Sequence, residues 1–429
     1  MPDRTPTIPA DVEAAMDAQA QAPFVRAPEA SRSIFVIIFV AACAPLAAGV
    51  VFFGFRALLV AAVSVAGCVA TESAYYHVTH TPALLGRMHA AVTGLLLALT
   101  LPPFTPWYVA LTGAVFAIIV GKAIFGGVGH FLWQPALVGR LAVAVIFAPP
   151  LMAVNLLDRP DWPVLAQARA GYGDVVAARR PPVYQRWQGT PPPARADAIL
   201  LPRPRDQLRA LTDPHRGDPK PMIDVLRHMP PARDLICGAH PGGIGETCVI
   251  AILVAGLYLV YRNYVRGHLP GLFLLAAAAT VAVAPIRGPD GQAWQWAPLL
   301  GQPLRAVLEP LAESGGALGA VAGQLTPHLS AQPVDVGFTY VVYHLACGEM
   351  MLAAWFLATE MTSRPVTGPG QAVFGILCGV GAMLGRLYTG SPIPAYVAVL
   401  AANTLTPALD AMRPRVLGHP RWWRRRRRA

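Results

Sequence analysis

Long apolar segments dominate this chain, and they recur at about the length that a helix needs to cross a bilayer. The first reads SIFVIIFVAACAPLAAGVVFFG, near residues 34–54. Hydrophobic residues make up 55% of the 429 positions and charged residues only 13%, against roughly 25% in a soluble domain. A soluble fold of this size needs far more polar surface. The pattern therefore predicts an all-α polytopic membrane protein.

The apolar segments and their flanks predict about ten transmembrane helices. They lie near 34–54, 57–76, 90–101, 107–125, 136–156, 245–262, 269–286, 337–358, 370–387 and 391–411.

The polar stretches between these segments divide the chain into five parts. They are an N-terminal tail (1–32), a first membrane half (33–156), an external Pro/Arg-rich loop (157–240), a second membrane half (241–411) with an insertion at 287–335, and a basic tail (412–429). An even number of spans places both termini on one side. Arg262 and Arg266 between two spans, and the run Arg424 to Arg428, indicate that this side is the cytoplasm.

The two halves resemble each other weakly. Residues 94–122 and 349–380 each contain an apolar run of small residues, a break with proline, and a Gly-rich apolar run. Five spans per half would invert one half relative to the other, as in many transporters. The alternative is that Gly/Ala/Leu-rich segments are alike by composition alone.

The net charge of +11 is concentrated in loops and tails, which suits orientation in a membrane and contact with anionic lipid. No stretch interleaves basic and aromatic residues as a nucleic-acid surface does. The six cysteines include no C-x-x-C pair, and five lie in or beside apolar segments. We therefore expect buried thiols rather than metal ligands.

The most specific motif is a Gly-rich turn between two spans. It contains Lys122, Gly126, Gly127 and Gly129, and PALVGR with Arg140 follows. Glycines allow backbone amides to approach a ligand, and a cation beside them suits a phosphate or a reduced flavin. Lys122 has an alternative role as a snorkelling side chain at a span end. Arg140 is an intramembrane cation and thus a functional candidate.

Two further polar segments interrupt apolar sequence. The first, GGIGET, contains Gly243, Gly245, Glu246 and Thr247 ahead of the sixth span. Glu246 is either a ligand-site residue or simply a cap in the first helical turn.

The second polar segment is the ATEMTSRPVT stretch, which contains Thr359 and Glu360. Glu360 is either an interface carboxylate or part of an ion path.

Four motifs in order carry a resemblance to a known family: TGLLLALTLPP, FGG-x-G with PALVGR, GGIGET with LYLVYR, and FLATE with PVT. Together they resemble the RnfD/NqrB family, with the third closer to RnfD, over residues 33–156 and 234–411. The resemblance implies two inverted five-helix halves similar to urea and ammonium channels. It also implies a subunit of a bacterial inner-membrane complex that couples flavin-mediated electron transfer to Na⁺ or H⁺ translocation.

Such a subunit works with other membrane subunits and is not a complete enzyme alone. The family carries FMN on a Thr of a Ser-Gly-Ala-Thr motif, with riboflavin bound nearby. This chain has no such motif in its external loop, which argues against covalent attachment. Lys220 is then the candidate to hold the FMN phosphate by charge. The alternative is a channel-like or scaffolding subunit of the same fold that has lost its flavin.

Overall fold

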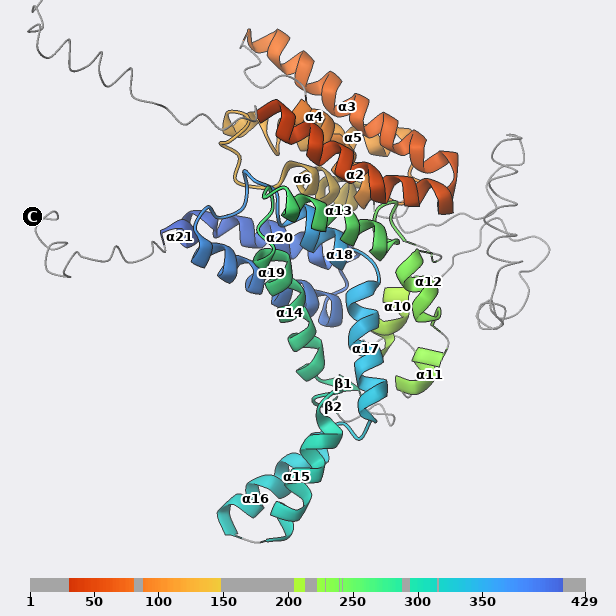
Figure 1. Cartoon of the computed structure of the whole chain (residues 1–429), viewed down its shortest axis with the longest axis vertical. Coiled ribbons are helices and arrows are strands. Elements are labelled where there is room, and N and C mark those ends of the chain that lie inside the picture. The colour runs from red at the N-terminus through yellow and green to blue at the C-terminus, as the bar shows by residue number, and fades with distance from the viewer. Residues whose placement is uncertain are drawn as a thin grey trace, which may run out of the picture.

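The computed structural model describes residues 31–80, 88–147, 204–212, 222–227, 229–238, 240, 242–287, 294–314 and 316–411. Figure 1 shows that the described elements are almost entirely helices. The tails 1–30 and 412–429 and most of the predicted loop 157–240 lie outside these ranges.

Over residues 31–80 and 88–147, the first membrane half contains five apolar helices, each at a position predicted from the sequence. They are α2 (Ser31–Phe53), α3 (Phe55–Thr79), α4 (Met88–Thr100), α5 (Trp107–Ile119) and α6 (Pro135–Ile146), with the short 3₁₀ helix η1 (Ala123–Phe125) before α6. Pro102 and Pro103 lie in the break between α4 and α5, because proline lacks the N–H that a helix requires. Pro135 opens α6, where that missing donor costs nothing.

The described part of the predicted loop 157–240 forms four short helices. They are α10 (Pro204–Leu208), η2 (Arg209–Leu211), α11 (Met222–Arg227) and α12 (Ala232–Cys237). α11 and α12 both contact the helix that precedes the central break of the second half. The loop is therefore docked on the membrane part over these residues.

The second membrane half repeats the apolar pattern. It consists of α13 (Val249–Tyr261), α14 (His268–Val283), α17 (Val334–Ala346), α18 (Met350–Leu352), the π-helix η4 (Ala353–Leu357), α19 (Gly368–Tyr388), α20 (Pro394–Thr404) and α21 (Thr406–Asp410).

The predicted insertion folds as a separate projection. The antiparallel strands β1 (Ile286–Arg287) and β2 (Trp294–Gln295) form its base, followed by α15 (Gly301–Glu313), α16 (Gly316–Leu325) and η3 (Thr326–His328). Figure 1 shows α15 and α16 extending away from the other helices. Their apolar side chains Val307, Leu318 and Val321 are exposed.

Four described helices are long and apolar enough to cross a membrane: α2, α3, α5 with η1, and α19. The pair α17 and α18–η4 is a fifth when counted as one bent span. Four shorter apolar helices, α4, α6, α13 and α14, have 10–17 residues. The chain is thus a multi-pass membrane protein.

The two halves pack against each other through α2 with α13 and through α6 with α20. Within the halves, α3 packs on α5 and α14 packs on α19. A single hydrophobic core runs through both halves and includes Leu97, Ile252, Phe273 and Phe374. The contacts between halves place polar groups of one half within reach of the other.

Candidate functional site

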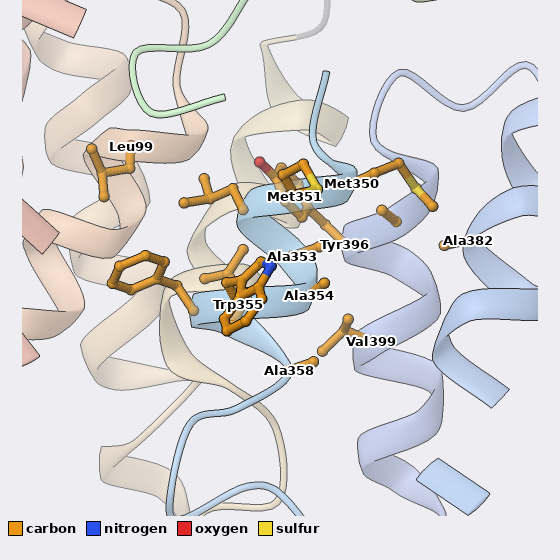
Figure 2. Close-up of a cluster of buried hydrophobic side chains, with 14 of the residues drawn as sticks. Leu99, Met350, Met351, Ala353, Ala354, Trp355, Ala358, Ala382, Tyr396 and Val399 are labelled. Atoms are coloured by element: carbon orange, nitrogen blue, oxygen red, sulfur yellow. The ribbon is translucent and has the colours of Figure 1, made fainter. Parts of the chain in front are cut away.

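A broken helix lies where the two halves meet. α17 and α18–η4 are bent by 62° at a break that contains Cys347, Gly348 and Glu349. Figure 2 shows α18 and η4 between Leu99 of α4 on one side and Tyr396 and Val399 of α20 on the other. π-Helical turns are rare and occur frequently at functional sites. Three polar groups surround this segment.

The first group lies in the first half and joins three buried side chains. Lys122 forms an ion pair with Glu72 of α3, and its Nζ lies 3.2 Å from Nδ1 of His89 at the start of α4. All three residues are about 2% exposed. An unpaired buried charge is costly, so Glu72 explains how Lys122 is tolerated at this depth. Lys122 is thus a paired cation rather than a snorkelling one.

Glu360 extends this group into the second half. Its Oε1 lies 3.9 Å from Nε2 of His89. Its Oε2 accepts hydrogen bonds from the backbone N–H of Thr362 and of Ser363, both at 3.0 Å, and from the Thr362 hydroxyl at 2.6 Å. The side chain is 11% exposed. Glu360 is therefore a partly buried carboxylate held in position by these donors.

A small cavity of about 30 Å³ adjoins His89 and Glu360. Its other polar lining residues include Thr93, Gln134 and Thr359. A cavity of this size has room for one water molecule. The Thr359 hydroxyl donates to the carbonyl of Trp355 in η4 at 2.7 Å, so its proton already has an acceptor.

The second polar group is built by the GGIGET loop. The Ile244 and Gly245 amides donate to the Leu101 and Leu99 carbonyls, each at 2.9 Å. A Cβ at Gly245 would lie 2.6 Å from Cβ of Leu99, so only glycine allows this approach. The loop thus packs against the LTLPP segment, and two motifs far apart in sequence form one structure.

Glu246 does not cap a helix. The predicted position in the first turn is wrong, because α13 begins only at Val249. Glu246 Oε2 instead accepts from the Gly243 amide at 3.0 Å, and Oε1 accepts from the Tyr396 hydroxyl at 2.5 Å. Glu246 therefore ties the loop to α20. Thr247 is fully buried beside it.

Arg140 lies in the second turn of α6 and is 3% exposed. Its Nε donates to the Thr100 carbonyl at 3.1 Å, at the end of α4 where the helix breaks. A cation at a helix C-terminus is favourable because it meets unpaired carbonyls. Arg140 therefore stabilises the break between α4 and α5.

The glycine turn has a different role from the GGIGET loop. Gly126, Gly127 and Gly129 all adopt positive φ, at 97°, 98° and 92°. A Cβ at Gly126 or Gly127 would meet only one atom at 4.0 Å, and one at Gly129 would meet none within 4 Å. The glycines are required by backbone conformation rather than by close packing.

The third polar group is an ion triad that no sequence motif predicted. Glu349 at the helix break is fully buried and receives Arg205 Nη1 at 2.8 Å and Arg386 Nη2 at 3.1 Å. Arg386 also donates to the carbonyls of His344 and Cys347. Because Arg205 belongs to α10, the triad fastens the segment that contains α10 to the broken helix.

The predicted site residues thus fall into separate places. Lys122 joins Glu360 through His89, whereas Gly243, Gly245, Glu246 and Thr247 lie in the loop near Arg140. Lys220 lies outside the described residues. The side chains that were missed are Glu72, His89, Arg205, Glu349, Arg386 and Tyr396. Glu72, Glu349 and Arg386 could have been found from the sequence, because each is an ionisable residue inside or beside an apolar segment.

The glycines of the GGIGET loop pack closely against neighbouring side chains. The space at Gly245 is filled by Leu99, and a Cβ at Gly243 would meet the Glu246 carboxylate at 2.7 Å. The charge of Lys122 is balanced by Glu72. Lys122 therefore already has a carboxylate partner and an imidazole neighbour within the protein.

Comparison with known proteins gives one family match. The family described as NQR2, RnfD, RnfE matches residues 18–418. This range includes all of the described helices.

Relatives from three bacteria align over nearly the whole chain. A subunit of an ion-translocating oxidoreductase complex from Yersinia enterocolitica is 28% identical, over 94% of this chain and 98% of its own. The protein of the same name from Halorhodospira halophila is 28% identical, over 93% and 95%. A subunit of the Na⁺-translocating ferredoxin:NAD⁺ oxidoreductase complex from Acetobacterium woodii is 28% identical, over 90% and 91%.

Proposed function

Because this chain belongs to the NQR2, RnfD, RnfE family, we propose that it is a membrane subunit of an Rnf-type complex that couples electron transfer to ion translocation. The observation that carries this proposal is the extent of the alignment, which spans at least 90% of this chain and of each relative described above. The family match at residues 18–418 also includes every described membrane helix.

Co-purification tests this role. The tagged chain is isolated from mild-detergent extracts of its native membranes. We expect other subunits of an ion-translocating oxidoreductase to co-purify, and deletion of the chain to abolish NADH-linked ion uptake into membrane vesicles. Isolation of the chain alone, together with normal ion uptake in the deletion strain, would contradict the proposal. Complementation with the exposed-site variant Glu309→Gln is the matched control.

The fold we propose is two inverted five-helix halves of the channel-like type. Equivalent positions support the repeat. In each half, a glycine near the end of one helix lies close to the proline that begins the next. A Cβ added at Gly121, after α5, would lie 2.8 Å from Cα of Pro135. A Cβ added at Gly385, in the last turn of α19, would lie 3.0 Å from Cβ of Pro394. These prolines open α6 and α20.

The residues that follow these glycines extend the match. Lys122 and Arg386 are both buried cations, and each is paired with a buried glutamate. Pro-Ala-Leu-Val at 135–138 also matches Pro-Ala-Tyr-Val at 394–397. These matched contacts at matched positions support a structural repeat over a likeness of composition alone.

Inversion of the halves predicts that the turns after α5 and α19 lie on opposite sides of the membrane. Single cysteines are introduced as His130→Cys and Thr389→Cys, both at exposed positions, in a background whose native cysteines are replaced by alanine. A membrane-impermeant thiol reagent should label one variant in sealed vesicles of one orientation and the other variant in the opposite orientation. Labelling of both from the same side would contradict the inverted arrangement.

We further propose that the protein lies in the bacterial inner membrane with both termini in the cytoplasm. The basic residues Arg262 and Arg266 between α13 and α14, and the Arg-rich C-terminus, support this orientation. A C-terminal fluorescent-protein fusion should fluoresce, and a C-terminal alkaline phosphatase fusion should be inactive. The reverse result would invert the topology.

FMN held without a covalent bond, with riboflavin nearby, is the cofactor that we propose. The absence of Ser-Gly-Ala-Thr supports non-covalent binding, and Lys220 is the candidate for its phosphate. Denatured protein should have an unmodified mass and release FMN. An FMN-sized mass increase would contradict non-covalent binding, and the absence of any flavin would favour a subunit that has lost it.

A further inference from the structure

We propose that Lys122, His89 and Glu360 form a proton relay between the two membrane halves, and that the ion handled at this place is H⁺. This inference rests on the proposed function, because an ion-translocating subunit needs a path for its ion. It adds the chemistry of the ion and the side chains that exchange it.

The geometry fixes how the His89 ring is used. The Lys122 ammonium has no acceptor lone pair, so His89 Nδ1 at 3.2 Å must accept from it. The neutral ring then carries its proton on Nε2, which faces Oε1 of Glu360. In the starting state, Lys122 therefore donates to His89, and the Nε2 proton of His89 faces Glu360.

Each step conserves protons and charge. Lys122 gives a proton to Nδ1, and the ring gives its Nε2 proton to the Glu360 carboxylate. The products are a neutral amine, a neutral imidazole protonated on Nδ1, and a carboxylic acid. The cycle closes when Glu360 releases its proton to solvent and the Lys122 amine takes up a proton from solvent. The imidazole returns to its starting tautomer when water removes the Nδ1 proton and another proton binds at Nε2.

The gap between His89 and Glu360 suits a water molecule. Their polar atoms are 3.9 Å apart, which is beyond direct hydrogen-bond distance. The adjoining cavity of about 30 Å³ has room for a water to bridge them. Oε2 of Glu360 is occupied by its three donors, so Oε1 is the atom positioned to receive the proton.

Two aromatic rings and three further ionisable groups surround this relay. Phe35 and Phe131 pack on the His89 ring, with centroids at 5.0 and 5.5 Å. Cys68 and Tyr76 interact with Glu72, and Arg364 interacts with Glu360.

The chemistry of the group disfavours a metal ion such as Na⁺. Hard cations bind several oxygen ligands, whereas the neighbours of the Glu360 carboxylate here include the His89 imidazole and, beyond it, the Lys122 ammonium. The positive charge of Lys122 would repel a second cation bound beside His89. A proton is the cation that such groups exchange directly.

The test uses the whole complex in liposomes, with internal acidification followed by a pH-sensitive dye during electron transfer. Lys122→Arg keeps the ion pair with Glu72 but cannot give up its proton. His89→Gln and Glu360→Gln keep size and hydrogen bonding but remove proton exchange. We expect each variant to lower the rate of proton uptake by about a hundredfold at equal amounts of assembled complex. His268→Gln makes the same chemical change as His89→Gln at an exposed position on α14, so it is the matched control and should keep the wild-type rate.

Wild-type rates in Lys122→Arg or Glu360→Gln would overturn the relay, as would variants that lose ²²Na⁺ uptake while proton uptake persists. Infrared difference spectra of the purified full chain, recorded between low and high pH, test the relay independently of the complex. A protonated carboxyl band that shifts in D₂O should appear in the wild type and disappear in Glu360→Gln. Its absence from the wild type would refute the relay, whereas a complex that moves no ion refutes the proposed function.

Discussion

Removal of the charge of Glu349 should destabilise the membrane part strongly. Glu349→Gln preserves the size of the side chain but replaces a carboxylate that two guanidinium groups approach at 2.8 and 3.1 Å. Arg205 is 8% exposed and Arg386 is 3% exposed, so neither cation is compensated by bulk water. Loss of one partner of a buried ion pair costs about 3–5 kcal/mol, and we expect a loss in this range.

The free energy of unfolding is measured in mixed micelles by titration with SDS, followed by tryptophan fluorescence. A loss of about 3–5 kcal/mol corresponds to roughly a hundredfold to several thousandfold in the unfolding equilibrium constant. The matched control is Glu309→Gln, which makes the same chemical change at an exposed position on α15. A surface change of this kind is expected to stay within about 0.5 kcal/mol.

A double variant distinguishes charge pairing from a packing defect. If the triad stabilises through charge, Glu349→Gln with Arg386→Gln should lose less than the sum of the two single variants, because the second change removes an unpaired charge. A Glu349→Gln protein within about 0.5 kcal/mol of the wild type would refute the reasoning. Strict additivity of the two single changes would show that these groups do not interact.

Two more changes test the packing of the GGIGET loop, each measured as the melting temperature in detergent. Gly245→Ala should lose about 1–3 kcal/mol, because its methyl group would meet Leu99 at 2.6 Å. Gly271→Ala, on α14 with open space around it, should be neutral or stabilising, and equal effects of the two would contradict the packing argument. Tyr396→Phe should lose about 1–3 kcal/mol, because the buried Glu246 carboxylate loses a donor at 2.5 Å, and an unchanged melting temperature would contradict that role.

Much of the fold could be predicted from the apolar segments and the helix-breaking residues between them. The predicted span near 34–54 is observed as α2 (Ser31–Phe53), and the one near 370–387 as α19 (Gly368–Tyr388). These helices follow from local rules, since a membrane segment must satisfy its backbone hydrogen bonds internally. The boundary of α13 was less predictable, because Glu246 is held by Tyr396, 150 residues away.

The candidate site was predicted only in part. Lys122, Arg140 and Glu360 were found because a charge within apolar sequence is unusual. Their partners were not found, since Glu72 lies 50 residues from Lys122, and His89 lies on a different helix from either. No local spacing connects such residues.

The sequence by itself therefore determined the membrane class, the helix positions and the family. These depend on hydrophobic length and on short motifs, which are properties of neighbouring residues. Only the tertiary structure decided which buried charges meet. In the sequence Lys122 is an isolated cation, whereas in the fold it packs against Glu72 and His89 in a buried, paired group. The physical reason is that the cost of a buried charge depends on its partners, and the fold alone brings those partners together.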